Sequence, residues 1–329
     1  MDDMNLTGAG LGIAGVFSAA GRIRPFIRRT PLEYSLPLSK LLGAEAYLKL
    51  ENLQVTGSFK VRGAASRMLL MTGRERESGV ISASSGNHAQ AVAMMAARLG
   101  IDAMIVVPES APQVKIENTR RYGAAVVVTG ADYDESEVRA WEIQKRTGRT
   151  YIHAFIDPQV VAGQGTVGLE LMEERPAIQQ VLVPAGGGGL AIGVAIAVKS
   201  INPSAQVIGV TSDTSPAWTE SRRAGRVVNP PVFPTLADGT AGGIAEYTFD
   251  LAASWVDDFI LVSEQDIRHA VAWMLDNHHY IIEGAAALGL AAVLSAHPCV
   301  QKLETAVVLT GQNIDTAQLL TVLAPQIKP

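Results

Sequence analysis

The stretch GVISASSGNHAQAVAMMAARLGIDAMIVVP, residues 79–108, decides the fold. An apolar run at residues 79–83 and another at residues 103–108 are typical of two buried strands. Between them, residues 88–100 carry apolar side chains at helical spacing and end in a glycine, as helices commonly do. A strand, a helix and a strand in this order predict a parallel sheet covered by helices.

The same alternation continues on both sides of this stretch. Roughly residues 70–155 form one α/β unit, and a second series of strands and helices follows it and predicts another α/β domain. Residues 213–248 are rich in Pro, Gly and Arg and are expected to be irregular, either as an active-site loop or as a long connection.

The bulk composition indicates a globular protein with small-molecule partners. The chain has 329 residues, 48% of them hydrophobic and 18% charged, so it can bury a large core. A net charge of −5 without any basic block gives no electrostatic reason to expect nucleic acid or a membrane surface. The single cysteine, Cys299, excludes an internal disulfide and multi-cysteine zinc sites. We therefore expect a cytoplasmic protein with no metal site.

A lysine opens a predicted helix in GSFKVRGA, residues 57–64. Ser58 could cap the helix, and Lys60 then falls in its first turn. The helix dipole and the apolar neighbours of Lys60 disfavour its charged form, which lowers its pKa and makes it a better nucleophile toward carbonyl groups. The alternative is an exposed lysine whose stem lies on Phe59.

A strand runs into a polar turn in SASSGNHAQ, residues 82–90. The hydroxyls of Ser84 and Ser85, the flexible Gly86 and the free N–H groups at the helix start make a cradle for a carboxylate. The alternative is an ordinary helix cap with His88 as a satisfied polar residue.

Four glycines lie between an apolar strand and an apolar helix in PAGGGGLA, residues 184–191. Residues without side chains let consecutive amides turn toward a phosphate, and the following helix adds its positive end. A dinucleotide site is the alternative, because the spacing G-x-G-x-x-A is met and Asp213 ends the next strand. The glycines are Gly186, Gly187, Gly188 and Gly189.

Thr310 ends the last apolar strand in VVLTGQN, residues 307–313. Its hydroxyl could bond a ring nitrogen without bringing charge, although a threonine there is also typical of a turn. An amine nucleophile, a carboxylate cradle, a phosphate cradle and a neutral hydroxyl together match one cofactor, pyridoxal 5′-phosphate, carrying an amino-acid substrate.

The chain resembles the fold-type II pyridoxal-phosphate enzymes, specifically the threonine/serine dehydratase and serine racemase group. The likeness runs in order through RTPLEYS, LKLENLQVTGSFKVRGA, SSGNHAQAVA, GQGTVGLEL, PAGGGGL, TLADG, EGAAALGLAA and TGQNID. It implies an α/β fold like that of the tryptophan synthase β chain, with two open twisted domains and the cofactor in the cleft. Residues 1–68 and 156–329 would form the large cofactor-binding domain, and residues 69–155 the small one.

The resemblance also implies residue roles. Lys60 would hold the cofactor as a Schiff base and remove the substrate α-proton, and Ser85 would be an acid/base on the opposite face. Cofactor contacts would come from Phe59, Lys60, Asn87, Gly186, Gly187, Gly188, Gly189, Gly239 and Thr310. Substrate contacts would come from Ser84, Ser85, Asn87 and His88, with Glu283 behind them.

Three departures from the racemase pattern favour dehydration. Glu137 stands where racemases have a substrate-binding arginine, Thr211 where they have a cation-binding glutamate, and Phe155 where they tend to have asparagine. We therefore expect a homodimeric enzyme of amino-acid catabolism that eliminates water from a 3-hydroxy amino acid such as threonine, serine or a bulkier analogue, giving a 2-oxo acid and ammonia. The alternatives are a racemase of the same family, an NAD-binding oxidoreductase and a catalytically silent ligand-binding module.

Overall fold

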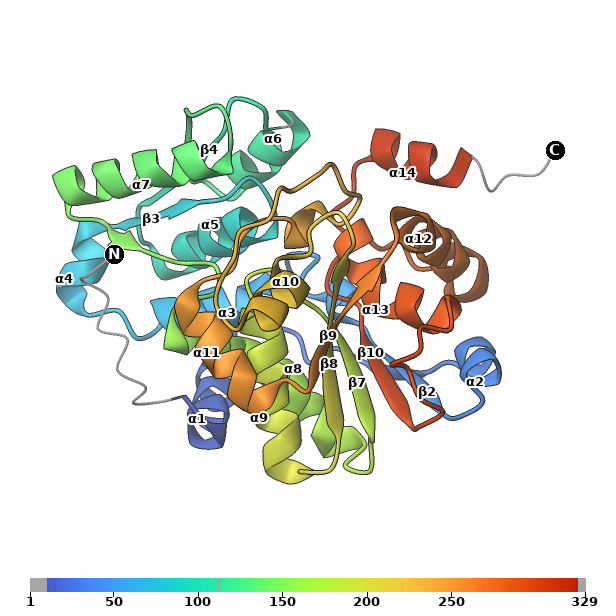
Figure 1. Ribbon diagram of the computed structural model, residues 1–329. Helices are drawn as coiled ribbons and strands as arrows, with labels where there is room; N and C mark the ends of the chain where they lie inside the picture. The colour runs from blue at the N-terminus through green and yellow to red at the C-terminus, as the bar shows by residue number, and fades with distance from the viewer. Residues whose placement is uncertain (1–10, 112, 325–329) are drawn as a thin grey trace.

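The computed structural model describes residues 11–111 and 113–324, and these form two sheets surrounded by helices (Figure 1). The large sheet has the strand order β1-β2-β10-β7-β8-β9 and is parallel except for the antiparallel pair of β1 and β2. Its strands are β1 (Leu32–Tyr34), β2 (Ala46–Lys49), β7 (Gln180–Pro184), β8 (Gln206–Ser212), β9 (Asp258–Val262) and β10 (Thr305–Val308).

The small sheet is parallel throughout and has the order β5-β4-β3-β6. Its strands are β3 (Val80–Ala83), β4 (Ala103–Val107), β5 (Ala125–Val128) and β6 (Thr150–Tyr151). The predicted strand–helix–strand unit of residues 79–108 is confirmed as β3, α5 (Asn87–Leu99) and β4. The boundaries expected for two domains stay a prediction.

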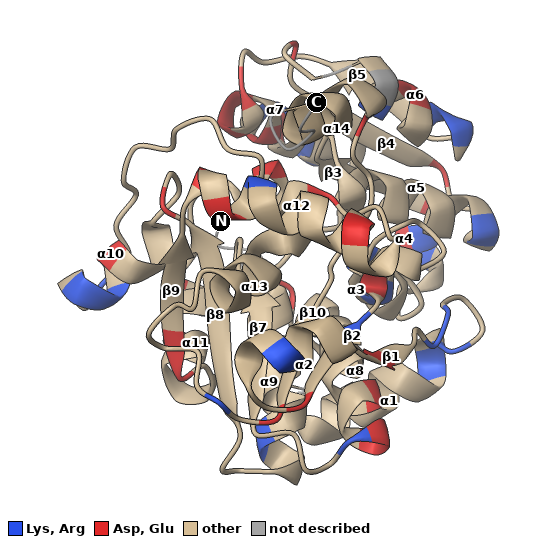
Figure 2. Cartoon of the chain, turned by 90° about the vertical axis from the view of Figure 1, so that its right-hand side faces the viewer, with Lys and Arg blue, Asp and Glu red and all other residues tan. Residues whose placement is uncertain are grey.

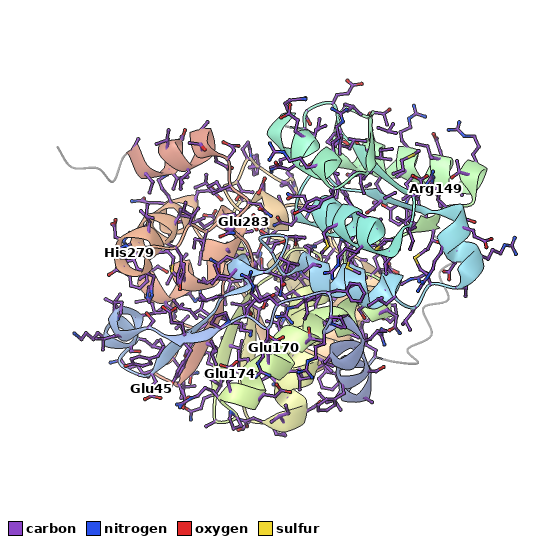
Figure 3. The ribbon with its side chains drawn as sticks, turned by 180° about the vertical axis from the view of Figure 1, so that it is seen from behind. Glu45, Arg149, Glu170, Glu174, His279 and Glu283 are labelled. Carbon is purple, nitrogen blue, oxygen red and sulfur yellow. The ribbon has the colours of Figure 1, made fainter. Side chains whose placement is uncertain are left out.

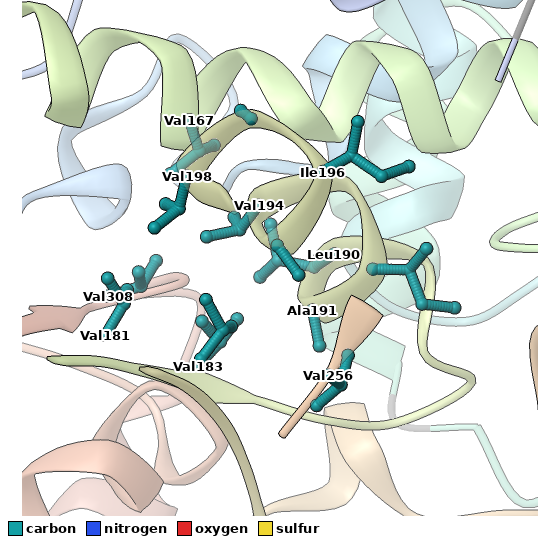
Figure 4. Packing of buried hydrophobic residues seen from close by; sticks show 14 of the residues in the cluster. Val167, Val181, Val183, Leu190, Ala191, Val194, Ile196, Val198, Val256 and Val308 are labelled. Atoms are coloured by element: carbon teal, nitrogen blue, oxygen red, sulfur yellow. The ribbon is translucent and has the colours of Figure 1, made fainter. Parts of the chain in front are cut away.

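Successive residues in the strands of the large sheet point into two separate cores. In β7, Val181 and Val183 belong to the core under one layer of helices, whereas Leu182 belongs to the core under the other. Figure 4 shows the first core, where these valines face Leu190 and Val194. Because both faces are covered, the strands read as continuous apolar runs. The first layer contains α1 (Ile13–Ile23), α8 (Pro158–Glu174), α9 (Gly189–Ile201) and α11 (Glu246–Trp255), and the second α2 (Leu36–Leu42), α12 (Glu264–His278), α13 (Gly284–Leu294) and α14 (Thr316–Leu323).

Helix α3 (Lys60–Met68) connects the regions around the two sheets. It shares a core with α5 of the small sheet, and it also lies directly against α8 of the large sheet. A Cβ at Gly163 would lie 2.5 Å from the carbonyl oxygen of Arg62, so the absence of a side chain there permits the close approach of α8 to α3. The small sheet is further covered by α4 (Gly73–Ser78), α6 (Gln113–Arg121) and α7 (Tyr133–Thr147).

The expectation that residues 213–248 are irregular is wrong for part of this stretch. The structure has helix α10 (Ala217–Ala224), the 3-10 turn η2 (Asp238–Thr240) and the start of α11 there. Trp218 of α10 is 1% exposed and stacks on Phe259 at 4.2 Å between ring centroids, so burial of these aromatic rings orders a segment whose composition suggested a loop.

The ends of neighbouring parallel strands bring the predicted site residues to one edge of the large sheet. β10 lies between β2 and β7, so Thr310 after β10 is flanked by the loop after β2 and the glycine turn after β7. Ligands of open α/β sheets bind at such strand ends. Basic and acidic residues of both signs are scattered over the helices around both sheets (Figure 2). Among the helices of the described residues, none has the length and apolar character that a membrane crossing needs.

Candidate active site

The loop that leads into Lys60 is fixed to the segment after β10. Ser58 forms an isolated antiparallel bridge with Gly311, and the Phe59 amide donates to the Thr310 carbonyl oxygen at 3.1 Å. The Gln312 amide donates in return to the carbonyl oxygen of Gly57 at 2.9 Å. The predicted Lys60 and Thr310 are therefore brought together, although 250 positions separate them in the printed sequence.

The expected capping role of Ser58 is wrong. Helix α3 begins at Lys60 itself, and Phe59 in the N-cap position provides no side-chain cap. The Ser58 hydroxyl is buried and has no hydrogen-bond partner among the described residues. Ser58 lies one residue before the N-cap position, where its backbone pairs with Gly311.

The Lys60 amine is in an environment that favours its neutral form. Burial lowers the pKa of Lys60 to about 8, and the carboxylate of Glu283 opposes this shift. Lys60 Nζ lies 5.2 Å from the centroid of the Phe59 ring, and the described residues offer it neither a hydrogen bond nor an ion pair. An amine with these properties is a suitable nucleophile and proton acceptor.

Asn87 opens α5 and links it to the opposite side of the site. Its Nδ2 donates to Glu283 Oε1 at 2.7 Å, and its Oδ1 accepts from Asn313 Nδ2 at 2.6 Å. Asn313 also donates to the Thr56 carbonyl oxygen at 2.9 Å. These bonds fix the side chain of Asn87 and leave it one further N–H for a ligand.

The side chain of His88 cannot donate a hydrogen bond to a ligand. Burial, followed by the charge of Lys60, lowers the pKa of His88 to about 3, so the ring is neutral. Its Nε2 lies 2.9 Å from the Ile152 carbonyl oxygen and must donate to it, which leaves Nδ1 as an acceptor without a partner among the described residues. A lone-pair nitrogen cannot donate to a carboxylate. The predicted substrate contact of His88 is therefore open only to its backbone amide.

Ser84 and Ser85 occupy the turn between β3 and α5, and both are partly buried. The Ser84 hydroxyl accepts from the Gly86 amide at 3.2 Å, which holds the turn closed. The described structure shows no hydrogen bond of the Ser85 hydroxyl. Its predicted part as an acid/base stays a prediction.

Two aromatic rings hold the glycine turn from the protein side. A Cβ at Gly187 would lie 2.3 Å from the Phe155 ring, and one at Gly188 would lie 2.6 Å from the ring of Trp218. Trp218 Nε1 also donates to the Gly186 carbonyl oxygen at 2.6 Å. The sequence predicts that these glycines bind a phosphate. At positions 187 and 188, however, packing against Phe155 and Trp218 already requires a residue without a side chain.

The amides of this turn nevertheless remain available. Within the described residues, the backbone N–H groups of residues 186–188 donate no hydrogen bond, and they precede the 13-residue helix α9. Free amides at the positive end of a helix form an anion site. Gly239 of η2 lies beside this turn, since a Cβ at Gly186 would be 3.4 Å from the Gly239 carbonyl oxygen.

Glu283 is the buried carboxyl group of the site. It precedes α13, is 6% exposed, and accepts the hydrogen bond from Asn87 (Figure 3). Burial, with the charge of Asp238 as the next cause, raises the pKa of Glu283 to about 7. Its presence behind the site agrees with the expectation, and it gives Asn87 and Lys60 an acidic neighbour.

The residues that departed from the racemase pattern have partners of their own. Glu137 Oε1 accepts from the hydroxyls of Tyr133 and Tyr151, each at 3.1 Å. The Thr211 hydroxyl donates to the carbonyl oxygen of Ser215 at 3.1 Å. These contacts occupy both side chains within the protein.

Sequence reasoning missed two residues that bond to the site, Trp218 and Asn313. Trp218 lies in residues 213–248, which the sequence predicts to be irregular. Asn313 follows Thr310 in TGQNID, and the prediction there names only Thr310. Asn313 could have been found from the sequence, because a side-chain amide so close to a predicted site residue can hydrogen-bond to the site.

Comparison with known proteins identifies the family. A family model described as pyridoxal-phosphate dependent enzyme matches residues 23–311. The chain is a pyridoxal-phosphate dependent enzyme. The enzyme is 46% identical over 294 residues to the L-threonine ammonia-lyase of Thermotoga maritima, which covers 89% of this chain and 73% of the relative. It is 41% identical over 318 residues to the catabolic L-threonine dehydratase of Staphylococcus aureus, which covers 95% and 92%.

Solved structures agree with this assignment. The structure of maize serine racemase matches with a TM-score of 0.91 and 33% identity, and it covers 96% of this chain and 98% of that one. The fold expected from the resemblance is therefore confirmed. The family match also decides for pyridoxal phosphate, and against a dinucleotide, as the cofactor of the enzyme.

The residues at the site fit pyridoxal phosphate. The free amides of the glycine turn suit its phosphate group, and the Lys60 amine suits its aldehyde. Thr310 is 3% exposed, and its hydroxyl makes no hydrogen bond that the described structure shows, so it is available to a ring nitrogen. The phosphate, the aldehyde and the ring nitrogen of the cofactor thus each have a residue type at the site that can bind them.

Proposed function

We propose that the enzyme removes water from L-threonine, and from related 3-hydroxy amino acids, and releases a 2-oxo acid and ammonia. The carrying observation is the Lys60 amine, with a pKa of about 8, at the start of α3, directly after a loop bonded to the Thr310 carbonyl oxygen. The two relatives that are 46% and 41% identical are an L-threonine ammonia-lyase and an L-threonine dehydratase, which supports threonine as the first substrate to test.

In this proposal Lys60 both carries the cofactor and moves the substrate α-proton. When bound, the cofactor supplies an aldehyde for the amino group and a ring that accepts electrons from the α-carbon. The Lys60 Nζ takes the α-proton in its neutral form, and positioned proton transfer of this kind contributes roughly 10²–10⁴-fold. The Lys60 ammonium formed in this way then gives a proton to the departing hydroxyl, which leaves as water. A water molecule hydrolyses the released unsaturated amine, through its imine form, to the 2-oxo acid and ammonia.

The other predicted residues bind and orient. The amides of residues 186–189 hold the phosphate, the remaining N–H of Asn87 bonds the ring hydroxyl, and Thr310 bonds the ring nitrogen. Phe59 and Gly239 border the ring. Ser84, Ser85 and the amides of Asn87 and His88 bind the substrate carboxylate at the start of α5.

The test is ammonia release from a panel of 3-hydroxy amino acids, run on both β-diastereomers. Lys60→Ala should abolish turnover and the yellow colour of the attached cofactor, whereas Lys40→Ala, at an exposed lysine near the end of α2, should change neither. Borohydride reduction followed by peptide mapping should place the cofactor on Lys60. A cofactor found on another lysine, or no oxo acid from any substrate, contradicts the proposal.

A racemase activity is the second candidate, supported by the likeness to maize serine racemase. It would use Ser85, whose hydroxyl is free of any hydrogen bond that the described structure shows, as the acid/base opposite Lys60. D-serine formed from L-serine without net pyruvate would favour it. Ser85→Ala should then abolish racemisation.

We further propose a cytoplasmic homodimer that acts in amino-acid catabolism, with the domain division expected from the sequence. The single cysteine suits a reducing compartment, and family resemblance favours the dimer. Sedimentation of the holoenzyme tests the dimer, and a mass of one chain contradicts it.

A further inference from the structure

Four charged side chains form a buried ion quartet, defined as Lys49, Glu51, Arg62 and Glu170. The first three are 0% exposed and Glu170 is 9% exposed. Two cations and two anions make the quartet neutral. It lies two residues along α3 from Lys60, since Arg62 is the third residue of that helix.

Arg62 is the centre of the quartet and makes paired bonds to both carboxylates. Its Nε and Nη2 donate to the two oxygens of Glu51 at 2.7 Å each. Its Nη1 and Nη2 donate to the two oxygens of Glu170 at 2.7 and 2.8 Å. Only the planar guanidinium can satisfy two carboxylates in this way, so its orientation is fixed in every direction.

Lys49 and two threonines complete the arrangement. Lys49 Nζ donates to Glu170 Oε2 at 2.7 Å and to the Thr30 carbonyl oxygen at 2.6 Å. The Thr30 hydroxyl donates to Glu51, and Arg62 Nη1 donates to the Thr166 hydroxyl at 3.0 Å. Each charge therefore has several partners.

The quartet joins α3, which carries Lys60, to two segments that lie next to other proposed cofactor contacts. Arg62 belongs to α3, whose first residue is Lys60. Lys49 ends β2, and its carbonyl oxygen accepts from the Leu309 amide at 2.9 Å, next to Thr310. Glu170 belongs to α8, which packs against α9, the helix that follows the glycine turn; Figure 3 labels Glu170.

Stability is a poor explanation for such a group. Burying four charges carries a desolvation cost, and a well-packed apolar replacement is often as stable or more stable. Apolar contacts are non-directional and do not fix the orientation of the groups that they bury. A group with many charge-assisted bonds at fixed angles holds three segments in one relative arrangement.

We propose that the ion quartet positions Lys60, with Arg62 as the positioning residue that fixes the first turn of α3 relative to Thr310 and the glycine turn. This inference rests on the proposed function, in which Lys60 carries the cofactor. It assigns Arg62 no contact with substrate or cofactor. Its effect reaches the reaction only through the place of the Lys60 amine.

The test replaces Arg62 by lysine, which keeps the charge and removes the planar guanidinium that bonds both carboxylates. We expect the Arg62→Lys variant to fold, to bind the cofactor on Lys60, and to lose about 10–100-fold in kcat with less than about 3-fold change in KM, since a misplacement near 1 Å costs about this much. The rate at which added pyridoxal phosphate attaches to the apoprotein should fall about tenfold. Arg67→Lys is the matched control, because Arg67 lies on the same helix and pairs with Glu75 and Asp157 outside the quartet.

Three results overturn the proposal. One is a folded Arg62→Lys variant whose kcat and attachment rate stay within twofold of the parent. Another is an equal loss in Arg67→Lys. If Arg62→Lys does not fold, Thr166→Val is used, because it removes one neutral partner of Arg62 without changing the charge. The third result is an unchanged rate of cofactor attachment in the Thr166→Val variant. Borohydride trapping on the unaltered enzyme separates the two proposals, because a cofactor found on another lysine refutes the assignment of Lys60 itself.

Discussion

Asn87 Nδ2 donates to Glu283 Oε1 across 2.7 Å and so joins the first turn of α5 to the residue that precedes α13. The two helices cover different sheets, and they approach each other at the strand ends where Lys60 and Thr310 also lie. Glu283 therefore sets the position of a proposed ring contact and contributes a titratable group close to the amine.

Glu283 should make the apoprotein less stable as the pH rises toward neutrality. Its folded-state pKa, about 7, exceeds the ordinary value of 4.5, so the folded state holds a proton that the unfolded state has lost between these values. Stability from this group is complete below pH 4.5 and is lost as pH rises through about 7. The shift corresponds to about 3 kcal/mol. Urea unfolding of the apoprotein should show Glu283→Gln gaining stability relative to the parent between pH 5 and 7.5.

The control for this prediction is Glu173→Gln, at an exposed carboxylate of α8. Its stability difference from the parent should stay nearly constant over the same pH range. A Glu283→Gln difference that is equally flat would show that the carboxyl group ionises normally despite its burial.

Gly187→Ala should be destabilising because of Phe155. The added Cβ would lie 2.3 to 2.5 Å from three atoms of the Phe155 ring, and overpacking of this kind costs about 1–3 kcal/mol. We also expect weaker binding of pyridoxal phosphate, measured by titration of the apoprotein. The double variant Gly187→Ala/Phe155→Ala should recover part of the stability lost by the first change.

Gly21→Ala serves as its control, since a Cβ there would meet no atom within 4 Å. This change lies inside α1 and should raise the free energy of unfolding by about 0.5–1 kcal/mol. If the double variant is no more stable than Gly187→Ala alone, the ring of Phe155 is not what keeps a side chain out.

Trp218→Phe should weaken cofactor binding without unfolding the enzyme. The change removes the donor that bonds the Gly186 carbonyl oxygen at 2.6 Å, and a hydrogen bond of this kind contributes about 1 kcal/mol. The dissociation constant of pyridoxal phosphate should rise about fivefold. Trp255→Phe, at a partly buried tryptophan of α11, should leave that constant unchanged. An equal effect in both variants would mean that the bond to Gly186 plays no part in shaping the turn.

The fold was readable from the sequence because its signals are local. Apolar runs such as residues 79–83 and 180–184 have the length and composition of buried strands, and glycines mark helix ends such as Gly100. Residues 213–248 were misread for the opposite reason. The order of α10 comes from Trp218 stacking on Phe259, 41 positions later in the printed sequence, and composition does not report such contacts.

The site divides in the same way. Lys60, Asn87 and Thr310 lie at strand or helix ends, so their neighbours in sequence already suggest a ligand site. Arg62 and Glu170 look like ordinary surface charges on two helices, and only the structure places them 2.7 Å apart across 108 positions. The expected capping role of Ser58 shows the same limit, because Ser58 pairs with Gly311 and α3 begins two residues later, at Lys60.

Lys115 and Asp238 should form a weak, salt-sensitive link between the two sheets. Lys115 Nζ lies 2.5 Å from Asp238 Oδ2 and connects α6, beside the small sheet, to η2, beside the glycine turn. The side chains are 19% and 48% exposed, so solvent screens the pair, and its coupling energy should be about 0.5–1 kcal/mol. A double-mutant cycle of Lys115→Met and Asp238→Asn, measured by urea unfolding at low salt, should give this value, and about 1 M salt should remove most of it. A coupling energy that is absent at low salt would mean that the packing of α6 and η2 brings the two charges together without any stabilisation from the pair. A coupling energy that is unchanged at high salt would contradict the expected screening of the pair by solvent.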